Sequence, residues 1–238
     1  APFAGALGGL GTYFAASADR ELLAGVADEL LAGAQPGSNR QLIAVRAVID
    51  VSPDSQRLLR WLEGDVPKGV LVDDDLRWRL LIALCAAGVK GDVDVDAERQ
   101  RDLSSQGALH ALRCRASIPT AEAKASVWHS IVSDASLSNS ELYALAERFF
   151  HRDQTDLTEK YTRRYFDEIP ATAAFRTGWM VERTALLVYP RYAVSDATVA
   201  LAQRCLTRAD LDPGVRRSIS DRTDDLRRVL RSRVTFGS

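Results

Sequence analysis

Val72–Gly88 reads VDDDLRWRLLIALCAAG, and this stretch indicates the fold class more clearly than any other part of the chain. It opens on three aspartates, Asp73–Asp75, and negative charge is favoured where a helix starts. The apolar residues that follow recur at i, i+4, i+5, i+8 and i+9, which places them on one helix face: Leu76, Leu80, Leu81, Leu84 and Cys85. Gly88 suits the left-handed conformation that ends many helices. We therefore predict an amphipathic helix of about four turns.

Two arginines of this stretch lie outside the apolar stripe. Arg77 points away from it, and Arg79 is predicted to pair with Asp75, four residues earlier on the same helix. Arginine and tryptophan side chains could also face a groove that takes a peptide. Our candidate peptide-contact residues are Arg77, Arg79, Trp179 and Arg183.

The composition is that of an ordinary globular protein. Of the 238 residues, 46% are hydrophobic and 26% are charged, and the net charge of −1 gives no global attraction to nucleic acid or an anionic membrane. No apolar run approaches the roughly 18 residues that a membrane helix needs. The first residues lack the basic segment of a signal peptide. We expect no nucleic-acid partner and no membrane partner.

The number and spacing of the cysteines indicate the cellular compartment of the protein. They are three, an odd number, and they lie far apart: Cys85, Cys114 and Cys205. This usage favours reduced thiols over a disulfide framework, so we expect a cytoplasmic protein.

Residues 1–16 are rich in glycine and alanine, with glycines at positions 5, 8, 9 and 11. A phosphate-binding loop would need a preceding strand and a following Gly-Lys-Ser/Thr, and neither is present. We expect 1–16 to be a linker or the ragged start of an excised segment, and 17–238 to form one helical domain.

From Ser17 onward, signals for the start of a helix recur at short intervals. Ser38–Gln41 and Ser138–Glu141 are typical of capping boxes. Ser52 followed by Pro53 is typical of a cap with proline at the first helical position.

The remaining segments also predict helices, including a long one from Asp94 or Asp96 to about Arg115. No segment alternates with period two, and the strand-like Gly69–Val72 is too short to build a sheet. About eleven helices joined by short loops predict an all-α fold. Helices pairing antiparallel with their neighbours predict an α-solenoid of the HEAT/armadillo kind.

The chain offers little catalytic chemistry. Its three histidines, His110, His129 and His151, are too widely spaced for a zinc motif. Cys114 lies four residues after His110, but a small apolar residue beside a polar neighbour explains that pair. Most carboxylates fall in first turns, where capping explains them. We expect no catalytic residue, no metal ligand and no cofactor in this chain, which is therefore not an enzyme by itself.

The C-terminal segment carries seven arginines: Arg216, Arg217, Arg222, Arg227, Arg228, Arg231 and Arg233. A nucleic-acid patch is one interpretation. Asp221, Asp224 and Asp225 interleave with them, however, and Asp224 stands four residues before Arg228, the favourable order for an ion pair. A solvated helix face is the better interpretation.

Several runs resemble one family in order and spacing. They are PGSNRQLIAVRAV (36–48), DDDLRWRLLIALCAAG (73–88), IPTAEAKASVW (118–128), SLSNSELYALAERFFHRDQTDLTEKYTRRYFDEI (136–169) and WMVERTALLVYP (179–190). Together they resemble the C-terminal helical domain of aminopeptidase N-type zinc peptidases, of the endoplasmic-reticulum aminopeptidase type and in particular the actinobacterial branch. The resemblance covers roughly residues 17–233.

The resemblance implies a non-catalytic domain. In that family a separate upstream domain carries the zinc helix, the glutamate base and the Gly-x-Met-Glu-Asn motif, and none of these is found here. The domain implied is a helical bowl that closes the active-site chamber and controls peptide access. Its partners would be the catalytic domain of the same polypeptide, which holds the zinc, and peptide substrates.

A rival interpretation needs no resemblance. An α-solenoid can stand alone as an adaptor and bind a protein or a peptide in its concave face.

Overall fold

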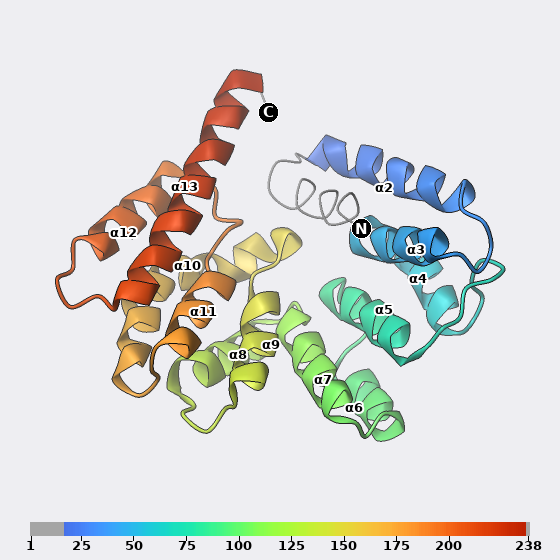
Figure 1. Ribbon diagram of the computed structural model, residues 1–238, viewed down its shortest axis with the longest axis horizontal. Helices are drawn as coiled ribbons and strands as arrows, with labels where there is room; N and C mark the ends of the chain where they lie inside the picture. The colour runs from blue at the N-terminus through green and yellow to red at the C-terminus, as the bar shows by residue number, and fades with distance from the viewer. Residues whose placement is uncertain (1–16, 237–238) are drawn as a thin grey trace. The chain divides into compact units, whose positions relative to one another are not determined.

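The computed structural model describes residues 17–236, so the prediction of a linker over 1–16 lies outside the described residues. Within 17–236 the chain forms twelve α-helices and two 3-10 helices, with no strand (Figure 1). The predicted all-α fold is confirmed, and the number of helices is close to the expected eleven.

The chain divides into two compact units, with the boundary between Gly107 and Ala108. The helices of the first unit are α2 (Ser17–Ala32), α3 (Asn39–Val51), α4 (Ser55–Leu62), α5 (Asp74–Ala86) and α6 (Asp92–Arg101). α7 (Ser105–Ser117) starts just before the boundary. The second unit continues with α8 (Ala121–Ser133), α9 (Asn139–Phe149), η1 (Arg152–Gln154), α10 (Thr155–Ala171), η2 (Thr172–Ala174), α11 (Trp179–Leu187), α12 (Asp196–Leu206) and α13 (Pro213–Phe236).

Each unit has a hydrophobic core of its own. In the first, the apolar faces of α2, α3, α4 and α5 meet around Val45, Trp61 and Leu80. In the second, Trp128 of α8 packs against Phe149 of α9 and Tyr161 of α10, with ring centroids 5.0 and 5.1 Å away. Aromatic rings bury large areas, so this cluster contributes strongly to the stability of the second unit.

Helix α5 confirms the prediction from its sequence. Asp73 is the N-cap, and its carboxylate accepts a hydrogen bond from the backbone N–H of Leu76 at 2.8 Å. All five residues of the predicted stripe are buried, and Trp78, which lies outside the stripe, is buried as well. Gly88 follows the helix with φ = 72°, the left-handed conformation expected of it.

Cationic side chains satisfy the last carbonyls of several helices. The final carbonyls of a helix have no partner within it and carry the negative end of its dipole. The donors include Arg77 for α4, Lys124 for α7 and α9, Arg176 for α8, Arg191 and Arg222 for α11, and Arg216 for α12. Each donor lies outside the helix it caps, so these contacts also tie neighbouring elements together.

The long helix predicted from Asp94 or Asp96 to Arg115 is wrong, because the chain breaks between α6 and α7. Asp102 causes the break by accepting hydrogen bonds from the backbone N–H of Ser104 at 3.0 Å and from Trp78 Nε1 at 2.7 Å. A hydrogen bond with the Ser104 side chain, then the one from Trp78 and the one from the Ser104 backbone, lower the pKa of Asp102 to about 2. An aspartate oxygen that accepts from a nearby backbone N–H competes with the helical carbonyl for that donor, and this favours the end of a helix.

Two capping predictions near α3 and α4 also need correction. Asp54, and not Ser52, caps α4 by accepting from the backbone N–H of Arg57 at 3.0 Å, so Pro53 precedes the helix. At α3, Ser38 caps the backbone N–H of Gln41 as predicted, but the Gln41 side chain accepts from Gly37 instead of completing the box. The predicted box at Ser138 and Glu141 is complete.

Helices contact near neighbours in sequence within each unit. α2 packs on α3 and α4 on α5 in the first unit, while α8 packs on α9 and α11 on α13 in the second. Such local packing is compatible with a helical-repeat protein. The predicted solenoid, and the single domain over 17–238, stay predictions.

Candidate functional site

The structure gives two of the candidate peptide-contact residues partners within the first unit. Arg77 donates from Nε and Nη2 to the two carboxylate oxygens of Glu98 at 2.9 and 2.8 Å. Glu98 is buried, and burial, the largest influence on its pKa, acts to raise that pKa. The hydrogen bonds from Arg77 and Arg101, together with the charges of these arginines, outweigh burial, so the pKa of Glu98 is lowered overall. Arg77 thus belongs to a paired, partly buried network.

Arg79 pairs across to another helix. The predicted contact between Arg79 and Asp75 is wrong, because Arg79 donates to Asp50 of α3. Asp75 instead accepts from Arg46 of α3 at 2.6 Å. The two cross-helix pairs form because α3 and α5 pack side by side, which the sequence of α5 by itself cannot reveal.

Trp179 and Arg183 lie one turn apart on α11, in the second unit, and both are exposed. Trp179 is 70% exposed although tryptophan is normally buried, and the nearby Phe175 is 44% exposed. Arg183 forms no ion pair or hydrogen bond with any side chain in the part of the chain that the structure describes. The exposed ring and the free guanidinium therefore stay available to a ligand.

Tyr143 belongs to α9, which packs on α11, and it lies within the electrostatic influence of Arg183. Its hydroxyl is inaccessible to solvent and has no hydrogen-bond partner among residues 17–236. Burial raises the pKa of Tyr143, and the charge of Arg183 partly opposes that shift. The phenol therefore stays protonated near neutral pH as a donor close to Arg183. We call Phe175, Trp179, Arg183 and Tyr143 the α11 surface.

The α11 surface offers apolar contact area and a fixed positive charge. A guanidinium can bind a carboxylate through two parallel hydrogen bonds. Tryptophan provides a rigid apolar platform and is over-represented where proteins contact peptides. The surface is therefore suited to a peptide that presents a carboxylate and an apolar side chain.

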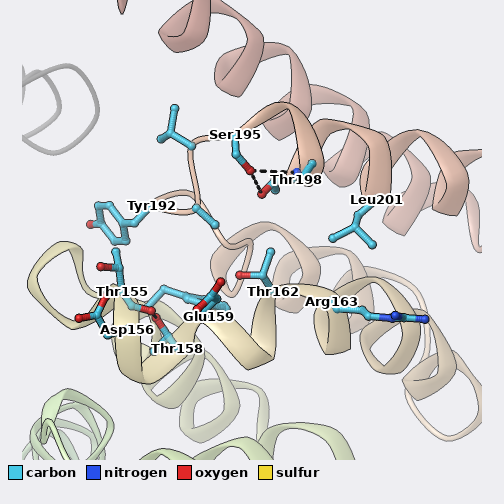
Figure 2. A pocket seen from close by; sticks show the side chains of 14 residues that line it. Thr155, Asp156, Thr158, Glu159, Thr162, Arg163, Tyr192, Ser195, Thr198 and Leu201 are labelled. Atoms are coloured by element: carbon cyan, nitrogen blue, oxygen red, sulfur yellow. Dashed lines mark hydrogen bonds between the residues drawn. The ribbon is translucent and has the colours of Figure 1, made fainter. Parts of the chain in front are cut away.

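A cavity of about 470 Å³ opens in the same unit between α10 and the segment that leads into α12 (Figure 2). Thr162 and Glu159 of α10 project toward Ser195 and Thr198 across it. None of the four candidate residues lines this cavity, so the sequence predictions missed it. One face of α10 carries only polar residues of the lining: Thr155, Thr158, Glu159 and Thr162. This polar face was the sequence signal that could have indicated the cavity.

The sequence also gave no indication of Lys124. Its side chain is fully buried in the second unit, where Nζ donates to the backbone oxygens of Ala116 at 2.6 Å and Phe149 at 2.9 Å. Burial lowers the pKa of Lys124 to about 7. These contacts are internal to the protein and explain the lysine by its role in the fold.

Two features are absent from residues 17–236: a metal-binding cluster and a helix able to span a membrane. Within 17–236 no three histidine, cysteine, aspartate or glutamate side chains group in a way that could hold a metal ion. Across the same residues, none of the helices combines the length and the apolar character that crossing a bilayer requires. The three cysteines are buried thiols that form no disulfide with one another.

Comparison with known proteins now identifies the family. Residues 14–228 match the model of the ERAP1-like C-terminal domain. The chain belongs to the ERAP1-like C-terminal domain family. It is also 33% identical over 208 residues to the protein named Aminopeptidase N from Streptomyces lividans, an alignment that covers 86% of this chain and 24% of that relative. The chain thus spans about a quarter of the length of the relative.

Membership of the ERAP1-like C-terminal domain family confirms the resemblance read from the sequence. The family name describes a domain that is C-terminal in its parent proteins. It assigns no chemistry to any single residue.

Proposed function

We propose that this chain is the non-catalytic C-terminal domain of a zinc aminopeptidase, which removes N-terminal amino acids from peptides. The observation that carries the proposal is the family match over residues 14–228, together with the relative named Aminopeptidase N, of which the chain spans 24%. In this proposal the zinc ion and the catalytic residues belong to another domain of the same polypeptide, which is the principal partner of this chain.

Within that protein, the domain closes the active-site chamber and controls which peptides enter. The α11 surface supports this role because Trp179 and Arg183 are exposed in the structure, and Arg183 has no acidic partner among the described residues. We place the peptide contact there rather than at Arg77 and Arg79. Those two arginines would first have to leave Glu98 and Asp50.

The test uses the full-length enzyme and the substitution Arg183→Ala. Losing a charge-assisted contact with a peptide carboxylate should raise KM for long peptides about tenfold, while KM for dipeptide-sized substrates stays unchanged. Arg231→Ala is the matched control, because Arg231 is also an exposed arginine, on α13. Identical kinetics of the Arg183 variant and the wild type on long peptides would refute the contact.

The non-catalytic role has a separate test. The 238-residue chain, incubated with zinc and N-terminally unblocked peptides, should release no amino acids. Zinc-dependent release by this chain alone would contradict the proposal. We also propose a cytoplasmic location, supported by three buried cysteines that remain thiols.

A second function is favoured by two exposed rings, Trp179 on α11 and Phe175 just before it. Phe175 and Trp179 would equally suit an adaptor that binds a foreign protein or peptide. The adaptor differs from the first proposal in one respect: it requires no catalytic domain in the same polypeptide.

A further inference from the structure

The cavity between α10 and α12 lies outside the α11 surface and has the features of a built site (Figure 2). Its volume of about 470 Å³ is within the range of roughly 300–1,000 Å³ typical of small-molecule pockets. Two elements of the second unit form it, and both are ordered by hydrogen bonds of their own. Thr158 donates to Gln154 at 2.9 Å, and Ser195 caps α12.

Thr162 places an unused hydroxyl in this cavity. The residue is only 8% exposed, yet its hydroxyl makes no hydrogen bond with any residue of the described chain. Thr158, one turn earlier, does bond back to the helix backbone. The Thr162 oxygen is not one of the fully buried side-chain atoms that lack a partner, so it remains accessible. It is therefore free to accept a hydrogen bond from an occupant of the cavity.

The opposite wall offers further oxygen atoms. The hydroxyls of Ser195 and Thr198 lie 3.0 Å apart, and Ser195 Oγ also accepts from the backbone N–H of Thr198 at 3.2 Å. Either hydroxyl could be the donor of the pair, and in both arrangements Thr198 Oγ1 keeps at least one acceptor lone pair. The cavity is therefore rich in acceptors on both sides.

The charge of the lining is negative. Asp156 and Glu159 line the cavity and form no ion pair with any residue between 17 and 236. The one cation of the lining, Arg163, lies 3.8 Å from Asp167, which lies outside the lining. The N-termini of α10 and α12 contribute only partial positive charge, and Asp156 and Asp196 in their first turns offset it.

Apolar side chains complete the lining. Phe150, Val194 and Leu201 contribute carbon surface beside the polar groups. An occupant must therefore combine a hydrogen-bond donor of positive charge with an aliphatic body. A primary ammonium has three donors, which matches the Glu159 carboxylate, the Thr162 hydroxyl and the hydroxyls across the cavity.

We propose that the cavity between α10 and α12 binds a primary alkylammonium group, with Glu159 as its counter-ion and the Thr162 hydroxyl as a hydrogen-bond acceptor. A free aliphatic amine and the lysine side chain of a peptide both carry this group. The inference depends on the second unit alone and stands whether or not the parent protein is an aminopeptidase.

The experiment is calorimetric titration of the 238-residue chain with n-hexylammonium, compared with hexan-1-ol as the uncharged analogue. We expect saturable binding of the ammonium and binding at least about tenfold weaker for the alcohol. Glu159→Gln should weaken ammonium binding about tenfold, and Thr162→Val should weaken it severalfold. Glu122→Gln, at an exposed carboxylate of α8 outside the cavity, should change nothing.

A second titration, with N-acetyl-lysine methylamide, distinguishes the two sources of the group. Binding of this probe supports a peptide lysine as the occupant, and binding of hexylammonium alone supports a free amine. Equal binding of the alcohol and the ammonium would overturn the proposal. So would an ammonium affinity that is unchanged in both cavity variants, provided that thermal melts show the variants to be folded.

Discussion

Lys124 shows how much a single residue contributes to the second unit. Its Nζ joins the C-terminal carbonyls of two helices, α7 and α9, and lies 5.4 Å from the centre of the Phe149 ring. The ammonium compensates the negative ends of both helix dipoles. When the side chain is neutral, its two N–H groups can still make both hydrogen bonds. The site therefore tolerates either protonation state.

Replacing Lys124 by methionine should lower the free energy of unfolding by about 2–4 kcal/mol, because two buried carbonyls lose their donors. Chemical denaturation followed by circular dichroism measures this. Lys160→Met is the matched control, because Lys160 is exposed on α10 and its loss should cost less than about 0.5 kcal/mol. Equal stabilities of the two variants would contradict the capping role.

The same lysine predicts a pH dependence. Burial lowers its pKa in the folded protein from 10.5 to about 7. Between these pH values the unfolded chain binds more protons than the folded one, so the Lys124 contribution to stability increases as pH rises from about 7 toward 10.5. This rise should be missing in Lys124→Met. A pH profile of the variant parallel to that of the wild type would exclude Lys124 as its source.

At the scale of the element, α5 forms the centre of the first unit. Leu80 and Leu84 are fully buried among residues of α3 and α4. Alanine at either position should therefore cost about 2–5 kcal/mol, from lost transfer free energy and the cavity left behind. Leu71→Ala is the control, because Leu71 is 78% exposed. Thermal melts that move no more for Leu80→Ala than for Leu71→Ala would refute the assigned face.

The break between α6 and α7 also depends on the absence of a side chain at Gly107. A Cβ at Gly107 would lie 2.5 Å from both the backbone oxygen and the Oδ2 of Asp102. Gly107→Ala should displace Asp102 from Trp78 and cost about 1–3 kcal/mol.

Gly25→Ala is the matched control for this substitution. It lies within α2, and nothing comes within 4 Å of an added Cβ there. It should be neutral or stabilising by up to about 1 kcal/mol, because alanine favours helix more than glycine. Urea denaturation of both variants makes the comparison, and a stable Gly107 variant would mean that the turn can rearrange at little cost.

At the scale of the whole molecule, the question is whether the chain acts within a longer polypeptide. An antibody raised against it and used on a lysate of the source organism, prepared with protease inhibitors, answers this. The proposed zinc aminopeptidase predicts a single band several times heavier than the 26.1 kDa of this chain. A band at the mass of the chain itself would favour the adaptor.

The sequence by itself determined the helical fold class, the position of α5 and its buried face, and the family. These are local properties: hydrophobic period, capping residues and runs of matching residues depend on neighbours along the chain. Trp179 and Arg183 were also selected from the sequence, and the structure leaves both exposed.

Only the tertiary structure decided which groups meet. It paired Arg79 with Asp50 instead of Asp75, because a partner on a packed neighbouring helix competes with one on the same helix. It buried Lys124, whose carbonyl partners lie 8 and 25 residues away in the chain. It ended α6 at Arg101, because Trp78 holds Asp102 from 24 residues away. Contacts between residues so distant in the chain leave no periodic signal, so only the folded arrangement reveals them.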